Sequence, residues 1–370
     1  MEFSTRRMVW LAVLVIVLIG PMAWLVQRLS FTSTFHYIDP VYVVSPSPDG
    51  RYLAYTEPNR TPVFVQDLQS GAVKEVPEVP NLQLALTWTG GGTYLVLRGL
   101  GSITVFDPDT GQSNWISDVS GYIPGTTGPW VGVVADDGSV QLQRLDAPAD
   151  RFPLFSPGIV PLVITGDGPA IGIRKDADTQ TLLYIDRPGA SPRVVTSGFR
   201  HVYASADAGA WLAVHPDESV YIGRPDGEAR RLDLGAGMLV SGVSWAPDGR
   251  SVAVFISRKM EDVRELLVLS ADGEIRFRTT APFRGDWEYS DDEESWWSPD
   301  GRFFAFPVFV TPDLWFKKAR VHRFNTTTWQ EQRWRIHGDW SHQLADFAWS
   351  NERLVFARLG DRLIRFELRP

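Results

Sequence analysis

The sequence contains no cysteine among its 370 residues, and only 5 of its 36 basic residues are lysine. The missing cysteine excludes disulfides, thiolate metal sites, a cysteine nucleophile and a lipidated cysteine. The preference for arginine over lysine is typical of a GC-rich, bacterial genome. Acidic residues number 44, so the formal net charge is -8. Neither nucleic acid nor an anionic lipid surface is therefore an expected partner.

Catalytic motifs are missing as well. The chain has no Gly-x-Ser-x-Gly nucleophile elbow, no His-Glu-x-x-His helix and no phosphate-binding glycine loop. These absences favour a binding protein over an enzyme, and the sequence gives no reason to expect a cofactor or a catalytic residue.

Only the N-terminus carries a long apolar run, because residues 8–26 are free of charge. This length spans a bilayer core as a helix. Arg6 and Arg7 precede the run and only Arg28 closely follows it, which places residues 1–7 in the cytoplasm and the rest outside. The alternative is a cleaved signal peptide, but its apolar core is usually shorter and no small-x-small cleavage site follows. We therefore predict an uncleaved, single-pass anchor in the cytoplasmic (inner) membrane, a linker over residues 27–40 and an extracytoplasmic domain over residues 41–370.

Past the anchor, short apolar runs alternate with turn residues. A triplet with a small residue between two apolar neighbours recurs eight times, centred on residues 54, 96, 132, 172, 213, 253, 305 and 355. The centres are 42, 36, 40, 41, 40, 52 and 50 residues apart. A period near 40 with several strands per repeat is typical of β-propeller blades. The sequence thus predicts an all-β, eight-bladed propeller, with seven blades as the alternative if a middle repeat is merged.

Three of the triplets follow a Pro-Asp-Gly turn, at residues 48–50, 247–249 and 299–301. Proline presets one turn dihedral, aspartate can bond its own backbone and glycine accepts a positive φ, so each turn should close a tight hairpin. The small central residue should let neighbouring sheets approach. Tryptophan stands just before the equivalent turn in four of the eight repeats, at positions 88, 245, 297 and 349. We expect these four to pack between blades rather than to bind a ligand.

Together with the third-strand segments 63–76, 103–116 and 182–195, these turns resemble the TolB-type propeller repeat, also found in dipeptidyl peptidase IV-like proteins. Its signature is an apolar residue before Ser-Pro-Asp-Gly and then an Ala-centred strand. The resemblance covers residues 41–370 and implies a scaffold, not an activity. Residues 107–115, Asp-Pro-Asp-Thr-Gly-Gln-Ser-Asn-Trp, also resemble the tryptophan-docking motif of quinone-dependent dehydrogenases. That family repeats the motif in most blades, and here it occurs once.

The last repeat has only three strand segments before the chain stops, at about residues 346–349, 353–358 and 362–368. Residues 33–38 could supply the fourth strand and close the ring, which removes an exposed edge.

The longest insertions are residues 257–265, 281–295, 311–319 and 336–345, and the expected strand order places all four on one face around blades six to eight. Long loops on a rigid scaffold commonly bind partners. We refer to these four insertions together as the inserted corner. Its acidic cluster suits a basic partner or calcium, with a solvated loop as the alternative. The expected partner-binding residues are Asp286, Trp287, Glu288, Asp291, Asp292, Glu293, Glu294, Trp315, Lys317, Lys318 and Trp340.

His337, Asp339 and His342 are candidate ligands for a transition metal, and an incidental grouping is the preferred interpretation. Two functional hypotheses remain. The first is a membrane-anchored interaction module, or scaffold, in a cell-envelope complex. The second is a hydrolase or lyase acting on sugars or peptides at the propeller channel. Charged or histidine side chains converging on the channel would favour the second hypothesis, and an aromatic patch at the inserted corner would favour the first.

Overall fold

The computed structural model describes residues 36–38, 44–56, 62–77, 79, 86–99, 101–147, 150–166, 168–235, 237–258, 264–279, 297–310, 318–335, 344–351, 354–359 and 362–367. They form thirty-one strands and one short 3-10 helix, η1 (Gly90–Gly92). None of the helical structure in these ranges is long and apolar enough to cross a membrane. Residues 8–26, the predicted anchor, lie outside these ranges.

The strands form eight antiparallel sheets, numbered here along the chain. Sheet 1 contains β2 (Val44–Pro46), β3 (Tyr52–Thr56), β4 (Val63–Asp67) and β5 (Val73–Glu75). Sheet 2 contains β6 (Leu86–Trp88), β7 (Leu95–Arg98), β8 (Ser102–Phe106) and β9 (Ser113–Ser117). Sheet 3 contains β10 (Gly121–Pro124), β11 (Trp130–Val134), β12 (Val140–Arg144) and β13 (Arg151–Phe155). Sheet 4 contains β14 (Ile159–Ile164), β15 (Ala170–Asp176), β16 (Thr179–Ile185) and β17 (Arg193–Phe199).

The remaining four sheets follow the same order. Sheet 5 contains β18 (His201–Ala204), β19 (Trp211–Val214), β20 (Val220–Gly223) and β21 (Arg230–Leu232). Sheet 6 contains β22 (Met238–Trp245), β23 (Ser251–Arg258), β24 (Arg264–Ser270) and β25 (Ile275–Thr279). Sheet 7 contains β26 (Phe303–Val310), β27 (Lys318–Asn325) and β28 (Glu331–Arg335), and a single bridge from Trp297 to Phe304 takes the place of its first strand. Sheet 8 contains β29 (Leu344–Asn351), β30 (Leu354–Leu359), β31 (Arg362–Glu367) and β1 (His36–Ile38).

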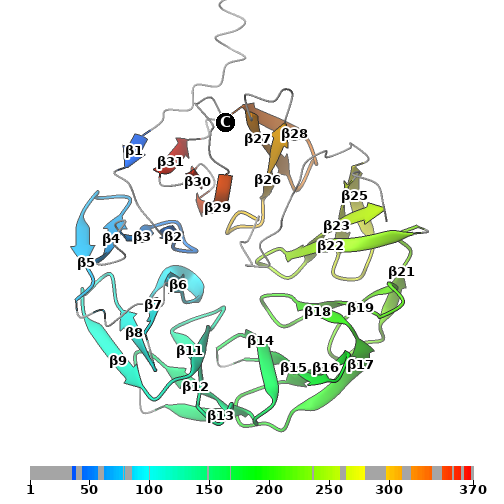
Figure 1. The fold of residues 1–370 in the computed structure, drawn as a ribbon, viewed down its shortest axis with the longest axis horizontal. Coiled ribbons are helices and arrows are strands. Elements are labelled where there is room, and N and C mark those ends of the chain that lie inside the picture. The colour runs from blue at the N-terminus through cyan, green and yellow to red at the C-terminus, as the bar shows by residue number, and fades with distance from the viewer. Residues whose placement is uncertain are drawn as a thin grey trace, which may run out of the picture.

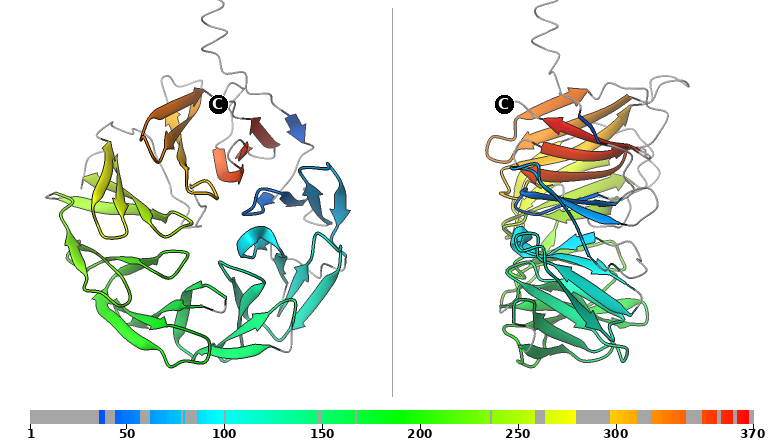
Figure 2. Two further views of the ribbon diagram at one scale, coloured as in Figure 1. Left: turned by 180° about the vertical axis from the view of Figure 1, so that it is seen from behind. Right: turned by 90° about the vertical axis from the view of Figure 1, so that its left-hand side faces the viewer.

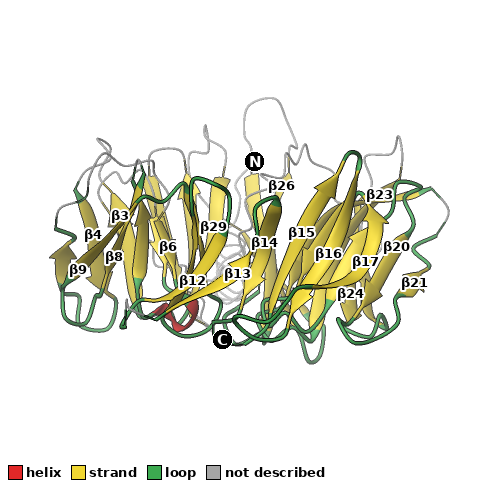
Figure 3. Cartoon of the chain, turned by 90° about the horizontal axis from the view of Figure 1, so that it is seen from below, coloured by secondary structure: helices red, strands yellow, loops and turns green. Residues whose placement is uncertain are grey.

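The sheets succeed one another around a ring, with the first strand of each sheet nearest the centre and the fourth at the rim (Figure 1). Two further views show the ring from behind and from the side (Figure 2). Inner turns join first to second strands and outer turns join third to fourth strands. In an antiparallel sheet both kinds of turn emerge on one face, here called the turn face. The opposite face, the loop face, carries the remaining connections, and the strands run between the two faces (Figure 3).

The ring closes by contacts between the first and the last sheet. β2 of sheet 1 contacts both β6 of sheet 2 and β29 of sheet 8. At the rim, β1 pairs antiparallel with β31, and His36 lies opposite Arg365. The sequence assigns a ring-closing strand to residues 33–38, and β1 occupies that place in the sheet. A strand from the N-terminal end of the domain therefore completes the C-terminal sheet.

The repeat alignment is confirmed, because each of the eight triplets lies in the second strand of its own sheet. Small central residues also let neighbouring sheets approach. A methyl group added to Gly132 of β11 would meet the side chain of Ile164 in the next sheet at 2.3 Å. Ala54, Ala213, Ala253 and Ala305 are fully buried at the equivalent position. The small residue thus sets how closely the sheets pack.

The Pro-Asp-Gly turns have the predicted backbone, since φ is 71° at Gly50, 66° at Gly249 and 69° at Gly301. In sheet 1 the Ser47 hydroxyl donates to Asp49 and accepts from the Tyr52 amide, which ties both sides of the turn together. In the turn of sheet 5, the Ser205 hydroxyl likewise donates to Asp207 and accepts from the Ala210 amide. Ala208, at φ 54°, takes the position of the glycine there. The turn of sheet 5 therefore has the same hydrogen bonds as that of sheet 1, although it lacks the Pro-Asp-Gly sequence.

The tryptophans before the turns make a recurring bond to the preceding sheet. The indole N–H of Trp88 donates to the Ser45 carbonyl over 2.9 Å, and that of Trp297 donates to the Ser244 carbonyl over 3.0 Å. Trp245 reaches the Tyr203 carbonyl over 3.3 Å. The predicted packing between sheets is confirmed for these three, and the hydrogen bond explains why tryptophan rather than another aromatic residue occupies the position.

Inner turns of sheets 2 to 5 are bonded to one another on the turn face. The Gly90 amide donates to the Gly125 carbonyl over 2.7 Å, and the Thr126 amide donates to the Ile164 carbonyl over 2.7 Å. The Thr126 hydroxyl also donates to the Ala206 carbonyl in the inner turn of sheet 5 over 2.5 Å. Three successive sheets are therefore held by one residue, which fixes the backbone of residues 125–127.

An outer turn of one design occurs in sheets 1, 2 and 7. Its first residue is Asp67, Asp107 or Asn325. The side chain of this residue accepts hydrogen bonds from the backbone amides two and three residues later. Its fifth residue has a positive φ, which is 75° at Gly71 and 76° at Gly111. In sheet 7 this residue is Trp329, at φ 54°, and its ring stacks on Phe277 of sheet 6 with centroids 4.9 Å apart. The left-handed backbone of Trp329 thus destabilises the turn, and the aromatic packing of its side chain between sheets offsets this cost.

This arrangement predicts an unusual order of stabilities at position 329. Trp329→Ala should lose the stacking and keep the left-handed strain, whereas Trp329→Gly should lose the stacking and relieve that strain. We expect both variants to be less stable than the wild type and the glycine variant to be the more stable of the two by about 1 kcal/mol. Equilibrium unfolding in urea measures the difference. A glycine variant that is less stable than the alanine variant would contradict the proposed strain.

Candidate functional site

The predicted partner-binding residues lie almost entirely outside the described residues. This applies to the acidic cluster, Trp287, Trp315, Lys317 and Trp340, and also to the metal candidates His337, Asp339 and His342. Lys318 is the first residue of β27, where its backbone pairs with Val310. In the ranges that the structure does describe, no group of three or more histidine, aspartate or glutamate residues is placed to hold a metal ion.

The strand ends that flank the inserted corner lie at the same end of the strands in sheets 6 and 7. In sheet 7, Val310 pairs with Lys318 and Arg320 pairs with Arg335, so residues 311–317 and 336–343 both start at the end of the sheet where β26 meets β27. In sheet 6, Thr279 pairs with Leu266, close to the end where β23 meets β24. Residues 280–296 leave from that end. The chain thus departs for all three segments from the loop face.

The inner strands test the idea of a catalytic channel. The described inner strands are β2, β6, β10, β14, β18, β22 and β29 (Figure 1). The first six contain no aspartate, glutamate, lysine or arginine, and β29 contains one acidic residue, Asp346. The only histidine of the seven strands is His201, and apart from Asp346 and Asn351 of β29 their other residues are apolar, small or hydroxylic. A pair of carboxylates that could act as general acid and base is therefore not supplied by these seven strands.

The tyrosine of β10 is held by the neighbouring sheet. The Tyr122 hydroxyl and the Thr87 hydroxyl of β6 are 2.9 Å apart. Burial raises the pKa of Tyr122 above its ordinary value, although the bond to Thr87 opposes the shift. The phenol therefore stays neutral at physiological pH and serves to join sheets 2 and 3.

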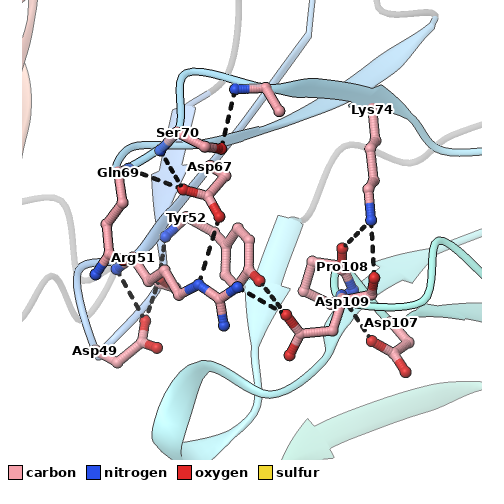
Figure 4. Close-up of polar contacts among 12 residues, drawn as sticks. Asp49, Arg51, Tyr52, Asp67, Gln69, Ser70, Lys74, Asp107, Pro108 and Asp109 are labelled. Carbon is pink, nitrogen blue, oxygen red and sulfur yellow. Dashed lines mark hydrogen bonds and ion pairs between the residues drawn. The ribbon is translucent and has the colours of Figure 1, made fainter.

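A polar cluster joins sheets 1 and 2 on the turn face (Figure 4). The Tyr52 hydroxyl donates to Asp109 over 2.6 Å, and the Arg51 guanidinium lies 2.9 Å from the same carboxylate. Arg51 also approaches Asp67 at 3.5 Å. Burial, reinforced by the bond to Asp109, raises the pKa of Tyr52 well above its ordinary value, so the phenol remains a hydrogen-bond donor. Since the carboxylate is already engaged by two donors, this cluster fixes one sheet against the next and does not form a proton-transfer site.

In three sheets, a basic residue near the start of the fourth strand donates hydrogen bonds to the outer turn of the following sheet. Lys74 donates to the carbonyls of Pro108 and Asp109 over 2.7 and 2.9 Å (Figure 4). Arg193 donates to the Pro225 carbonyl over 2.9 Å and pairs with Asp226, and Arg230 donates to the Asp272 carbonyl over 3.1 Å. We call these three residues the rim cations. We did not predict these three residues from the sequence, although a basic residue near the start of the fourth strand recurs in these repeats.

The inner turns present carboxylates on the turn face, at Asp49, Asp207, Asp248 and Asp300. Burial opposes the charged form of Asp300, but hydrogen bonds from Ser298 and Arg302 lower its pKa below the ordinary value. Asp207 lies directly over the next turn, where a methyl group on Gly249 would meet its carboxylate at 2.3 Å. The carboxylates thus serve turn geometry within their own sheet and packing with the next one.

Trp115, the last residue of the tryptophan-docking motif, does not dock between sheets. Its side chain is 62% exposed on β9 at the rim. Lys74 instead covers the outer turn of sheet 2 from the side of sheet 1, with its Cδ 3.8 Å from the place of a Gly111 methyl group. The motif therefore builds an outer turn and leaves its tryptophan in solvent.

No protein-family model matches the chain, and no curated protein matches it in sequence. Solved structures do resemble it. The WD40 domain of SCAP from fission yeast is 14% identical, with a TM-score of 0.57 over 90% of this chain and 98% of that one. The C-terminal WD40 domain of Sif2 is 12% identical, with a TM-score of 0.56 over 92% and 100%. Oligogalacturonate lyase from Vibrio parahaemolyticus is 12% identical, with a TM-score of 0.52 over 92% and 98%. The chain has a β-propeller fold, as the sequence repeats predict.

Proposed function

We propose that this chain is a membrane-anchored, extracytoplasmic β-propeller that holds a protein partner in a complex of the bacterial cell envelope. Residues 1–7 lie in the cytoplasm, residues 8–26 cross the membrane and residues 27–40 lead to the ring. The ring is an eight-bladed propeller of the TolB-type repeat, with β1 as the outer strand of its last blade. The inserted corner binds the partner.

One observation carries the choice of a binding function. The seven described inner strands contain one carboxylate residue, Asp346 of β29, one histidine, His201 of β18, and no lysine or arginine, so they offer no pair of carboxylates to a substrate in the channel. The similar structures include both WD40 domains and a lyase, and fold alone does not choose between them. The composition of the inner strands favours binding.

Rigidity of the ring also supports a scaffold role. Thr126 bonds sheets 3, 4 and 5 together, and the rim cations fix successive sheets at the outside. A binding segment that leaves such a ring starts from strand ends of fixed position, which lowers the entropy lost on association. Residues 280–296, 311–317 and 336–343 start from such ends.

Shortening residues 281–295 to a tight turn tests the site and the orientation together. We expect the variant to insert and fold normally, because surface connections tolerate such changes, and to lose the partner that crosslinking captures with the wild type in native membranes. A matched control shortens residues 57–61, a connection on the loop face of sheet 1. Protease added to spheroplasts should remove the propeller of all three proteins. Equal recovery of the partner by the shortened variant would refute the site, and a protected propeller would refute the orientation.

A further inference from the structure

The outer strand of sheet 2, β9, lacks the residues that protect six of the other outer strands of the ring against pairing. β9 pairs with β8 alone among the described residues, so its other edge carries backbone groups that no neighbouring strand satisfies. Natural sheets discourage pairing at such edges with lysine, arginine or proline. These residues occur in the outer strands β5, β13, β17, β21, β25 and β28. They are missing from β9, which reads Ser-Asn-Trp-Ile-Ser, and from the three-residue β1.

β9 also exposes a large aromatic surface. Trp115 is 62% exposed, more than Val194 at 58% or Val73 at 50% on other outer strands. Side chains alternate along a strand, and the next residue, Ile116, packs on the opposite face with Val119 and Leu145 in the core between sheets 2 and 3. The tryptophan is therefore held out from a strand whose other face is anchored, and no residue of the described ranges stacks on it.

The end of β9 is negatively charged. Asp118 follows the strand, is exposed, and adopts a left-handed backbone with φ 61°. Its Oδ2 accepts the Ser117 hydroxyl over 2.9 Å, and none of the ion pairs within the described residues includes it. A carboxylate at the end of an uncharged strand favours a cation on whatever pairs with that strand.

We infer that β9 is a docking strand for an extended segment of a partner protein. The segment adds a fifth strand to sheet 2, places an apolar side chain against Trp115 and sets a lysine or arginine beside Asp118. Backbone hydrogen bonds supply affinity in this mode, and the alternating side chains supply specificity. A second copy of the chain fits less well, because two chains of net charge -8 repel each other. The inference rests on the proposed function as an interaction module, and adds a site far from the inserted corner in sequence.

The test begins with a phage-displayed library of random seven-residue peptides, selected on the purified full-length chain. We expect the selected peptides to alternate apolar and polar residues and to carry a lysine or arginine near one end. A synthetic representative should slow hydrogen exchange at the amides of residues 113–117. N-methylation of every second peptide amide in one register should abolish binding, and methylation in the other register should not, because only one edge of a strand pairs.

Variants of the protein locate the site. Trp115→Lys should weaken the peptide about 30-fold, as expected for loss of an interface tryptophan. Val194→Lys is the matched control, because Val194 is similarly exposed on an outer strand, and it should leave the affinity unchanged. Asp118→Asn should weaken binding a few-fold and reduce its dependence on salt.

Four results would overturn the inference: no enriched peptide, exchange protection confined to other segments, equal affinity of the Trp115→Lys variant, or dimers of the chain that Trp115→Lys dissociates. Failure of the proposed function is distinguishable from failure at β9. If peptides bind at β9 but the partner is still recovered after residues 281–295 are shortened, β9 is supported as a docking strand and the inserted corner is refuted as a binding site. If no peptide binds at β9 but shortening residues 281–295 abolishes recovery of the partner, the inserted corner is supported and the docking role of β9 is refuted.

Discussion

Replacing Gly90 by alanine should destabilise the propeller by about 3 kcal/mol or more, although the change adds a single methyl group. A Cβ at this position would lie 1.9 Å from the Thr126 carbonyl oxygen and 2.0 Å from its carbon. Both are backbone atoms, so no rotamer change can relieve the clash. Thr126 cannot withdraw without breaking its bonds to Ile164 and Ala206, and Gly90 itself donates to Gly125. The inner turns of sheets 2 to 5 should therefore loosen together.

Gly227→Ala is the matched control for this prediction. Gly227 lies in the outer turn of sheet 5, where an added Cβ would meet the Arg224 Cβ at an ordinary 3.7 Å. Neither glycine has a left-handed φ, so the pair isolates the steric term. We expect the control variant to unfold within about 0.5 kcal/mol of the wild type in urea, as surface substitutions usually do. A Gly90→Ala variant with an unchanged unfolding midpoint would show that the inner turns are not interlocked as described.

Loss of the Trp297 side chain should have an effect of similar size. Trp297 is 2% exposed and packs with Phe304 at a centroid distance of 4.9 Å. It belongs to a core shared by sheets 6 and 7 that includes Phe255 and Ala253. Trp297→Ala should cost about 3 to 5 kcal/mol, as truncations of buried large aromatics do. Trp297→Phe should cost about 1 to 2 kcal/mol, because the ring remains while the Ser244 carbonyl loses its indole donor.

The exposed Trp115 supplies the control for this series. Its side chain is 62% exposed, so Trp115→Ala should change the free energy of unfolding by no more than about 0.5 kcal/mol. The three variants are compared by urea unfolding followed by near-ultraviolet circular dichroism. Equal costs for Trp297→Phe and Trp297→Ala would mean that the hydrogen bond to the preceding sheet, rather than packing, dominates the role of this tryptophan. A costly Trp115→Ala would show that β9 is part of the core.

The sequence by itself determined the repeating local structure. Pro-Asp-Gly predicted the positive φ that Gly50, Gly249 and Gly301 adopt, and the triplets predicted the second strand of every sheet. Tryptophan before the turn predicted burial between sheets, which Trp88 and Trp297 show. These features follow from sequence because they depend on the dihedral preferences and alternation of a few adjacent residues, which the chain carries wherever it lies.

Contacts between sheets were decided only by the tertiary structure. Lys74 of sheet 1 donates to Asp109 of sheet 2, and Thr126 of sheet 3 donates to Ala206 of sheet 5. Residues of the same type also lie in different surroundings, since Trp297 is buried and Trp115 is exposed. Such pairs are tens of residues apart, and whether they meet depends on the distance and angle between sheets, which the packing of all the side chains around the ring sets jointly. Local preference fixes the shape of each repeat, and the closure of the ring decides which residues of different repeats touch.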